Sequence, residues 1–261
     1  MFYYFGYGSN LNALGMRTKG VGTINTRPAA LNNWRLAFNI NHPYSFEGKV
    51  ANVVRAAGET VHGALHLCPD EALEMLDDFE GINVYYDRLL LQVDAYDGES
   101  IDAYVYVGTR TMQGNEGNPS ARYRQLLFDG GSKLGIEPHY LQWLASLETH
   151  PRPNFGPFDS SGAERLFTRD EIVALSNHTI LDGHVFDMSD AGSHQHTLLP
   201  MLEKRDVTQF FLQRMITEGS IDSALVTERD PQSAAQNTYL NEYLHAFAYE
   251  YRYVGQLVES K

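Results

Sequence analysis

The chain opens with Phe2-Tyr-Tyr-Phe-Gly-Tyr-Gly-Ser-Asn-Leu11, an aromatic run that ends in two closely spaced glycines. Such a run predicts a buried strand, and the glycines after it predict a loop. Because glycine permits positive φ and close approach of a ligand, the amides of Gly8, Ser9 and Asn10 are able to point into one pocket. That arrangement suits a carboxylate or a developing oxyanion. On turn statistics alone, an ordinary tight turn is the simpler interpretation.

Alternating apolar residues continue beyond this loop in four segments. The period of two over Trp34–Ile40 and over Val61–Leu67 predicts strands with one buried face. The same period over Leu89–Val93 and over Ile101–Val107, with Asp97-Gly98 between them, predicts a hairpin. Many strands with two or three helices predict an α+β fold built on a closed or strongly curved sheet.

Three helices are expected in the same part of the chain. Residues from Pro69 to Phe79 carry apolar side chains at three- and four-residue spacing, which predicts a short amphipathic helix with Glu80 at or just past its C-terminal end. A second helix is expected from Pro119 to Phe128, with Gly130-Gly131 as its stop. A third is expected from about Glu137 to Leu147.

Glu80 lies in the acidic stretch Leu76-Asp-Asp-Phe-Glu-Gly81. Mutual repulsion and partial burial of carboxylates favour proton uptake, which an acid/base residue needs. The alternative is a solvated, acidic helix end, and this alternative holds for most acidic clusters. Glu80 differs from its acidic neighbours because it stands between Phe79 and Gly81, which favours an inward-facing side chain.

Together these segments resemble the γ-glutamylcyclotransferase family, whose barrel fold is shared with the AIG2-like proteins. The resemblance covers residues 1–150. It implies that the loop holds the glutamyl head of a substrate and that Glu80 moves the proton. The matching parts, in chain order, are the strand leading into Tyr7-Gly8-Ser9-Asn10-Leu11, the Leu-Asp-x-x-Glu-Gly pattern, a tyrosine just after it, and Pro119-Ser-Ala-Arg-Tyr123.

The chemistry that the resemblance implies is intramolecular. The α-amine of a γ-glutamyl group attacks its own γ-carbonyl, which gives 5-oxoproline and releases an amine. One carboxylate that first accepts and then donates a proton suffices, so neither a metal nor an organic cofactor is expected. Position relative to the family motifs makes Tyr86, Tyr106 and Tyr123 the candidate substrate-binding tyrosines, and Tyr85 and Tyr104 remain alternatives for the first two.

Residues 151–163 are rich in proline and glycine and predict a linker between domains 1–150 and 164–261. In the second domain, Thr168–Glu171 has capping-box spacing and Asp182-Gly183 predicts a hairpin turn. Two helices follow over Leu198–Arg205 and Val207–Ile216, and alternation predicts a last strand over Tyr249–Tyr253.

This second domain resembles, more faintly, the cytochrome b5-like α+β fold. The family's His-Pro-Gly-Gly haem loop is absent, and Gly192–Thr197 stands in its place, so haem binding is not expected. A metal site at the clustered histidines is an alternative to exposed loop side chains. We interpret the domain as an accessory module that caps the barrel, pairs two subunits as a homodimer, or shapes the amine side of the pocket. The histidines are His178, His184, His194 and His196.

Composition narrows the classes of partner. The chain has 20 basic and 33 acidic residues, a formal charge of −13, which opposes binding to nucleic acid or to an anionic membrane. Cys68 is the single cysteine, so no intramolecular disulfide forms, and we interpret it as a buried small residue. We expect a cytoplasmic enzyme with a small-molecule γ-glutamyl substrate. The rival classes are a non-catalytic scaffold that keeps the barrel and a haem- or metal-dependent redox protein.

Overall fold

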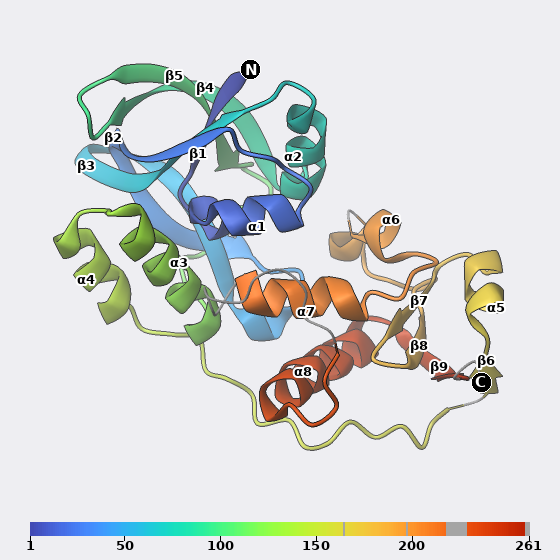
Figure 1. Cartoon of the computed structure of the whole chain (residues 1–261). Coiled ribbons are helices and arrows are strands. Elements are labelled where there is room, and N and C mark those ends of the chain that lie inside the picture. Colours follow the sequence, from blue (N-terminus) through green and yellow to red (C-terminus); the bar gives the residue numbers. More distant parts are fainter. Residues whose placement is uncertain (164, 197, 218–228, 259–261) are drawn as a thin grey trace. The chain divides into compact units, whose positions relative to one another are not determined.

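The computed structural model describes residues 1–163, 165–196, 198–217 and 229–258 (Figure 1). Their contacts divide the chain into two units. The first comprises Met1–Arg152 and Thr217, and the second comprises Pro153–Ile216 together with residues 229–258. Among the helices within these ranges, none combines the length and the apolar character needed to cross a bilayer.

The first unit is built on a closed β-barrel, as the alternating segments predicted (Figure 1). Its strands are β1 (Phe2–Gly6), β2 (Asn25–Asn41), β3 (Lys49–Cys68), β4 (Tyr86–Ala95) and β5 (Ser100–Gly108). Around the barrel the order is β1-β3-β2-β4-β5, and these neighbours pair antiparallel. The barrel closes where β1 runs parallel to β5, with Tyr4 opposite Tyr104.

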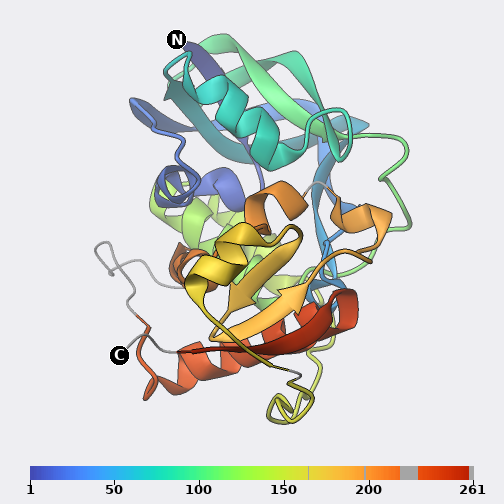
Figure 2. The same cartoon turned by 90° about the vertical axis from the view of Figure 1, so that its right-hand side faces the viewer.

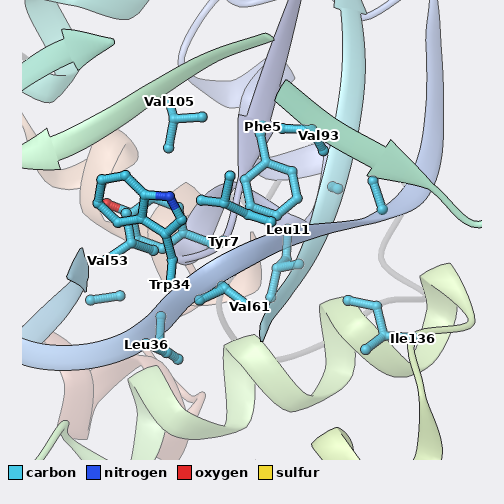
Figure 3. Packing of buried hydrophobic residues seen from close by; sticks show 14 of the residues in the cluster. Phe5, Tyr7, Leu11, Trp34, Leu36, Val53, Val61, Val93, Val105 and Ile136 are labelled. Atoms are coloured by element: carbon cyan, nitrogen blue, oxygen red, sulfur yellow. The ribbon is translucent and has the colours of Figure 1, made fainter. Parts of the chain in front are cut away.

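The barrel interior is filled by apolar side chains from all of its strands. Phe5, Trp34, Val93 and Val105 each expose 6% or less of their surface. Figure 3 shows these side chains turned toward the space that the strands enclose. Burial of large apolar groups is the main favourable term in folding, so this cluster supports every element that holds the site.

Helices cover the barrel and extend its connections. They are η1 (Ser9–Leu11), α1 (Ala13–Thr18), η2 (Ser45–Glu47), α2 (Ala72–Glu80), α3 (Ala121–Leu134) and α4 (Pro138–Ser146). The helix predicted over Pro69–Phe79 is α2, and Glu80 is its last residue. Gly81, with φ of 60°, ends the helix in the left-handed conformation that glycine favours.

The prediction that Gly130-Gly131 stops a helix was wrong. Both glycines are buried inside α3, which continues until Gly135 adopts a φ of 76°. A Cβ atom at Gly130 would lie 3.0 Å from Leu11 Cβ, and one at Gly131 would lie 2.9 Å from Leu141 Cδ2. These glycines therefore allow close packing, whose benefit exceeds the intrinsic cost of glycine in a helix.

The second unit contains a four-stranded sheet in the order β6-β9-β8-β7. The long helix α8 packs on it, with the rings of Phe186 and Phe247 5.4 Å apart (Figure 2). The elements are β6 (Arg165–Phe167), α5 (Arg169–Ala174), β7 (His178–Leu181), β8 (His184–Asp187), η3 (Ser193–Gln195), α6 (Leu199–Leu202), α7 (Thr208–Thr217), α8 (Ala234–Glu250) and β9 (Arg252–Leu257).

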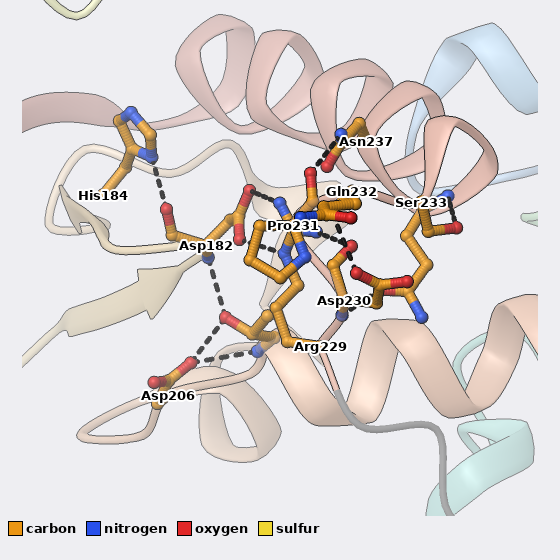
Figure 4. Close-up of polar contacts among 11 residues, drawn as sticks. Asp182, His184, Asp206, Arg229, Asp230, Pro231, Gln232, Ser233 and Asn237 are labelled. Atoms are coloured by element: carbon orange, nitrogen blue, oxygen red, sulfur yellow. Dashed lines mark hydrogen bonds and ion pairs between the residues drawn. The ribbon is translucent and has the colours of Figure 1, made fainter.

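The hairpin turn between β7 and β8 is held by an ion pair. Asp182 and Gly183 both have positive φ, as the Asp-Gly signal predicted. The Asp182 carboxylate accepts from Arg229 Nε at 2.7 Å and from Arg229 Nη2 at 3.1 Å (Figure 4). The predicted capping box at the start of α5 is also present, since the side chains of Thr168 and Glu171 cap each other's backbone amides.

The strand predicted over Tyr249–Tyr253 begins later than expected. Helix α8 continues to Glu250, and β9 starts at Arg252. Tyr239, Tyr243 and Phe247 recur every four residues and are buried, so they form the helix face that packs into this unit. Alternation over five residues was a weaker signal than this longer helical period.

We predict that Gly63→Ala lowers the free energy of unfolding of the first unit by about 1–3 kcal/mol. Gly63 lies in β3, and a Cβ atom there would lie 2.6 Å from Gly6 O and 2.6 Å from Phe5 Cζ. A backbone atom of a paired strand cannot move aside cheaply. Gly22→Ala is the matched control because no atom lies within 4 Å of its added Cβ. Equal urea denaturation midpoints for the two variants would contradict the prediction.

Candidate active site

The loop after β1 and the end of α2 meet at one hydrogen bond. Asn10 Nδ2 donates to Glu80 Oε1 at 2.7 Å, although the two residues are 70 positions apart. Asn10 is 3% exposed, and Glu80 is half-buried. A buried amide at this distance fixes the direction of the carboxylate. The structure thus brings together the two features that the sequence singled out.

Asn10 is held by contacts on its side chain and its backbone. Its Nδ2 also donates to Tyr4 Oη at 2.7 Å, and its Oδ1 accepts from Lys19 Nζ at 2.5 Å. Its backbone carbonyl bonds His66 Nε2 at 2.7 Å. Glu80 Oε2, in contrast, has no hydrogen-bond partner among the residues that the structure describes. One carboxylate oxygen is therefore anchored, and the other makes no hydrogen bond to a described residue.

Two glycines allow the loop to pack at this place. A Cβ atom at Gly6 would lie 2.7 Å from Asn10 O, and one at Gly8 would lie 2.8 Å from Tyr123 Oη. Neither glycine has positive φ, so close approach rather than backbone conformation requires glycine here. The loop turns as η1, in which Leu11 N–H donates to Gly8 O at 3.0 Å. That amide is thus used within the turn.

Three of the candidate tyrosines have their hydroxyl groups fixed by backbone atoms. Tyr7 Oη donates to Tyr106 O at 2.5 Å, and Tyr86 Oη donates to Ala51 O at 2.9 Å. Ala51 N–H in turn donates to Tyr123 Oη at 3.3 Å. Burial raises the pKa of Tyr7 well above its usual value, and the nearby Glu80 charge adds to the effect. Burial likewise raises the pKa of Tyr86. The phenols of Tyr7 and Tyr86 therefore stay neutral and act as hydrogen-bond donors.

Tyr106 ties the barrel to the helix that carries Glu80. Its hydroxyl donates to Asp77 Oδ1 at 2.5 Å, and Asp77 Oδ2 forms an ion pair with Arg88. Asp77 belongs to α2, three residues before Glu80, whereas Arg88 and Tyr106 belong to β4 and β5. Burial, followed by the hydrogen bond to Asp77, raises the pKa of Tyr106. This contact fixes the last turn of α2 against the barrel wall.

The two alternative candidates, Tyr104 and Tyr85, make other contacts. Tyr104 is half-buried, and the Arg88 guanidinium stands 4.7 Å from the centre of its ring. Tyr85 is also half-buried and packs beside Gly81, where an added Cβ would lie 2.9 Å from Tyr85 Cδ2. Of each neighbouring pair, the structure gives Tyr86 and Tyr106 the hydrogen bonds that are described above.

His66 contacts the loop through its hydrogen bond to Asn10 O, and this role was not foreseen from the sequence. Its Nδ1 lies 2.8 Å from Thr26 Oγ1, and its ring stacks 5.8 Å from that of Tyr4. Because Asn10 O can only accept, the His66 proton is on Nε2 and Nδ1 accepts from the Thr26 hydroxyl. Burial lowers the pKa of His66 to about 4. The imidazole is therefore neutral at physiological pH.

Comparison with known proteins finds a family model that matches part of the chain. Residues 4–125 match the family model described as Gamma-glutamyl cyclotransferase, AIG2-like. The likeness to this family concerns that part of the chain. No curated protein sequence matches the chain significantly.

Solved structures share the cyclotransferase fold. A gamma-glutamyl cyclotransferase is 22% identical with a TM-score of 0.50, over 57% of this chain and 88% of that one. An uncharacterized protein from Homo sapiens is 22% identical with a TM-score of 0.52, over 59% and 92%. YkqA from Bacillus subtilis is 22% identical with a TM-score of 0.50, over 57% and 55%. At this identity the likeness concerns the fold.

The comparisons give no support for a cytochrome b5-like second domain, which stays a prediction. Three of its four clustered histidines have protein partners: His194 Nε2 lies 2.9 Å from Glu250 Oε2, and the Nδ1 atoms of His178 and His184 each lie 2.7 Å from a backbone carbonyl. Within the described ranges, no three His, Cys, Asp or Glu residues are grouped to hold a metal ion.

Cys68, in the first unit, is fully buried, which confirms its interpretation as a buried small residue. Burial raises the pKa of its thiol to about 11. The thiol is therefore protonated at neutral pH and is a poor nucleophile.

We predict that Tyr106→Phe lowers the free energy of unfolding by about 1–3 kcal/mol because it leaves the half-buried Asp77 carboxylate without its phenol donor. Tyr104→Phe removes the same atom two residues away on β5, where the structure gives the hydroxyl no hydrogen bond to a described residue. This control should change stability by less than about 0.5 kcal/mol. Denaturant titrations of both variants test the difference, and equal losses would refute the assigned role of the Tyr106–Asp77 contact.

We predict that His66 makes stability depend on pH. The unfolded histidine takes up a proton near pH 6.5, but the folded one does so only near pH 4. The folded state therefore loses up to about 3 kcal/mol as pH falls from about 6.5 to about 4. His66→Gln keeps a donor for Asn10 O and removes this titration. Urea midpoints across this range should fall more steeply for the wild type than for the variant, and parallel curves would contradict the prediction.

Proposed function

We propose that the first unit cyclises the γ-glutamyl group of a γ-glutamyl amine, amino acid or peptide to 5-oxoproline and releases the amine. Glu80 is the general base and then the general acid. The observation that carries this proposal is the Asn10–Glu80 hydrogen bond, because it places a half-buried carboxylate with one unpartnered oxygen beside the glycine-containing loop. The match of residues 4–125 to the cyclotransferase family model supports the same reaction.

The proposed reaction begins with proton transfer from the substrate α-ammonium to Glu80 Oε2. The freed amine attacks the γ-carbonyl carbon, which closes a five-membered ring and places a negative charge on the carbonyl oxygen. As the bond from this carbon to the leaving nitrogen breaks, Glu80 returns the proton to that nitrogen. Glu80 then takes the second proton from the ring nitrogen and passes it to the released amine, which leaves as an ammonium ion. The carboxylate is thereby regenerated, and atoms and charge balance without a further reactant. Formally the activity is that of a cyclising transferase or lyase.

The loop and the tyrosines would hold the folded substrate. We assign substrate binding to Tyr7, Tyr86, Tyr106 and Tyr123, whose phenols are neutral or fixed by hydrogen bonds near the loop. Holding the glutamyl chain in its ring-forming conformation supplies the entropic part of catalysis. Hydrogen-bond donors directed at the developing oxyanion supply the electrostatic part. The backbone amides of residues 8–10 are the proposed donors, because the Leu11 amide is used within the turn.

Glu80→Gln should lower kcat on a panel of γ-glutamyl amino acids and amines by about 10²–10⁴-fold, because an amide cannot relay the proton. Formation of 5-oxoproline is the measurement. Glu74→Gln, at an exposed position of the same helix, should retain wild-type turnover. Circular dichroism should show that both variants fold.

Full turnover by Glu80→Gln would refute its assignment as the acid/base residue. Failure of the wild type on the entire panel would refute the proposed activity and favour a binding protein that retains the barrel. For the second unit we propose an accessory role, in capping the barrel, pairing subunits or shaping the amine side of the pocket, with a cytochrome b5-like fold as the hypothesis for its origin.

A further inference from the structure

Lys19 is a cation at the candidate site that the reaction described above does not use. Its Nζ lies 2.5 Å from Asn10 Oδ1 and 3.5 Å from Ser9 Oγ, and 5.7 Å from the centre of the Phe79 ring. The side chain is half-buried. Lys19 thus reaches both the loop and the residue that precedes Glu80.

The turn after α1 brings Lys19 to this position. The amides of Lys19 and Val21 both donate to Met16 O, and Gly20 adopts a φ of 77°. A Cβ atom at Gly20 would lie 2.6 Å from Met75 Sδ, so the turn packs directly against α2. Placement of Lys19 is therefore part of the packing between the two helices and not a chance orientation of a surface side chain.

The Asn10 amide separates two opposite charges. Its oxygen accepts from the Lys19 ammonium, and its nitrogen donates to the Glu80 carboxylate. The head of a γ-glutamyl compound also carries two opposite charges, an α-ammonium and an α-carboxylate, on one carbon atom. If the α-ammonium faces Glu80, as proton transfer requires, Lys19 offers the α-carboxylate a group of opposite charge on the other side of the Asn10 amide.

We propose that Lys19 binds the α-carboxylate of the substrate and makes the site selective for γ-glutamyl compounds in which this carboxylate is free. This inference rests on the proposed function. The carboxylate keeps its charge throughout the reaction, so Lys19 contributes equally to the ground state and the transition state. Its loss therefore raises KM and leaves kcat almost unchanged.

Charge balance gives an independent reason for a cation here. A substrate α-carboxylate placed beside Glu80 without a counter-charge would repel it. The positive charge of a lysine at the amide oxygen of Asn10 offsets that repulsion. If Lys19 served only to orient Asn10, its removal would disturb Glu80, and kcat would fall whether or not a substrate has an α-carboxylate.

The test compares a γ-glutamyl amine with its counterpart in which the α-carboxylate is an α-carboxamide, using the full chain. Lys19→Met should raise KM for the carboxylate substrate by about 10–100-fold, the range for loss of a charged hydrogen bond. For the carboxamide substrate, KM and kcat should stay within about twofold. Lys19→Arg keeps the charge and should restore most of the affinity. Lys133→Met, at an exposed position of α3, is the control and should match the wild type.

An unchanged KM for the carboxylate substrate would overturn the inference, as would an equal fall in kcat for both substrates. Thermal unfolding shows whether Lys19→Met is folded, and Lys19→Gln provides a second neutral variant. If the wild type turns over neither substrate, the proposed function fails, and the inference fails with it. Wild-type turnover without any effect of the Lys19 variants refutes the inference alone.

Discussion

The hydrogen bond between Asn10 and Glu80 is the interaction on which the candidate site depends. It joins Asn10, in the loop after β1, to Glu80, the last residue of α2. The two residues meet because the barrel holds both of these segments in place. Asn10 is held by Tyr4 and His66 on neighbouring strands, and α2 is held by Tyr106 through Asp77. A buried polar network of this kind is stable only when its members are satisfied together.

This dependence explains why contacts outside the site matter for its chemistry. The contacts of Asp77 with Arg88 and Tyr106 fix the orientation of α2. The hydrogen bond from the neutral His66 ring to Asn10 O fixes the position of the loop. Small residues at Gly6, Gly8 and Gly130 let the chain segments approach closely enough for these contacts to form. The accurate geometry that the proposed proton transfer needs is thus built from packing as well as from hydrogen bonds.

Local sequence patterns predicted the closed sheet, the loop and the position of Glu80, because strand alternation, glycines and a short amphipathic period are each written in consecutive residues. They could not predict the partners Tyr4, Lys19 and His66, since these meet Asn10 only through barrel register and helix packing. The pairing of Tyr4 with His66 across β1 and β3 is such a long-range fact. Gly130-Gly131 was misread for the same reason: the close neighbours of a helical glycine lie elsewhere in the chain.

Closure of the barrel by its first and fifth strands has a consequence for how the protein is made. Tyr4 pairs with Tyr104, so the aromatic strand β1 leaves the ribosome about a hundred residues before its last partner. Pairings of such sequence separation form late and leave strand edges exposed in the meantime. The Asn10–Glu80 contact spans a shorter interval, but it is locked only when Tyr106 on β5 arrives. We therefore expect the site to assemble late in the folding of this unit.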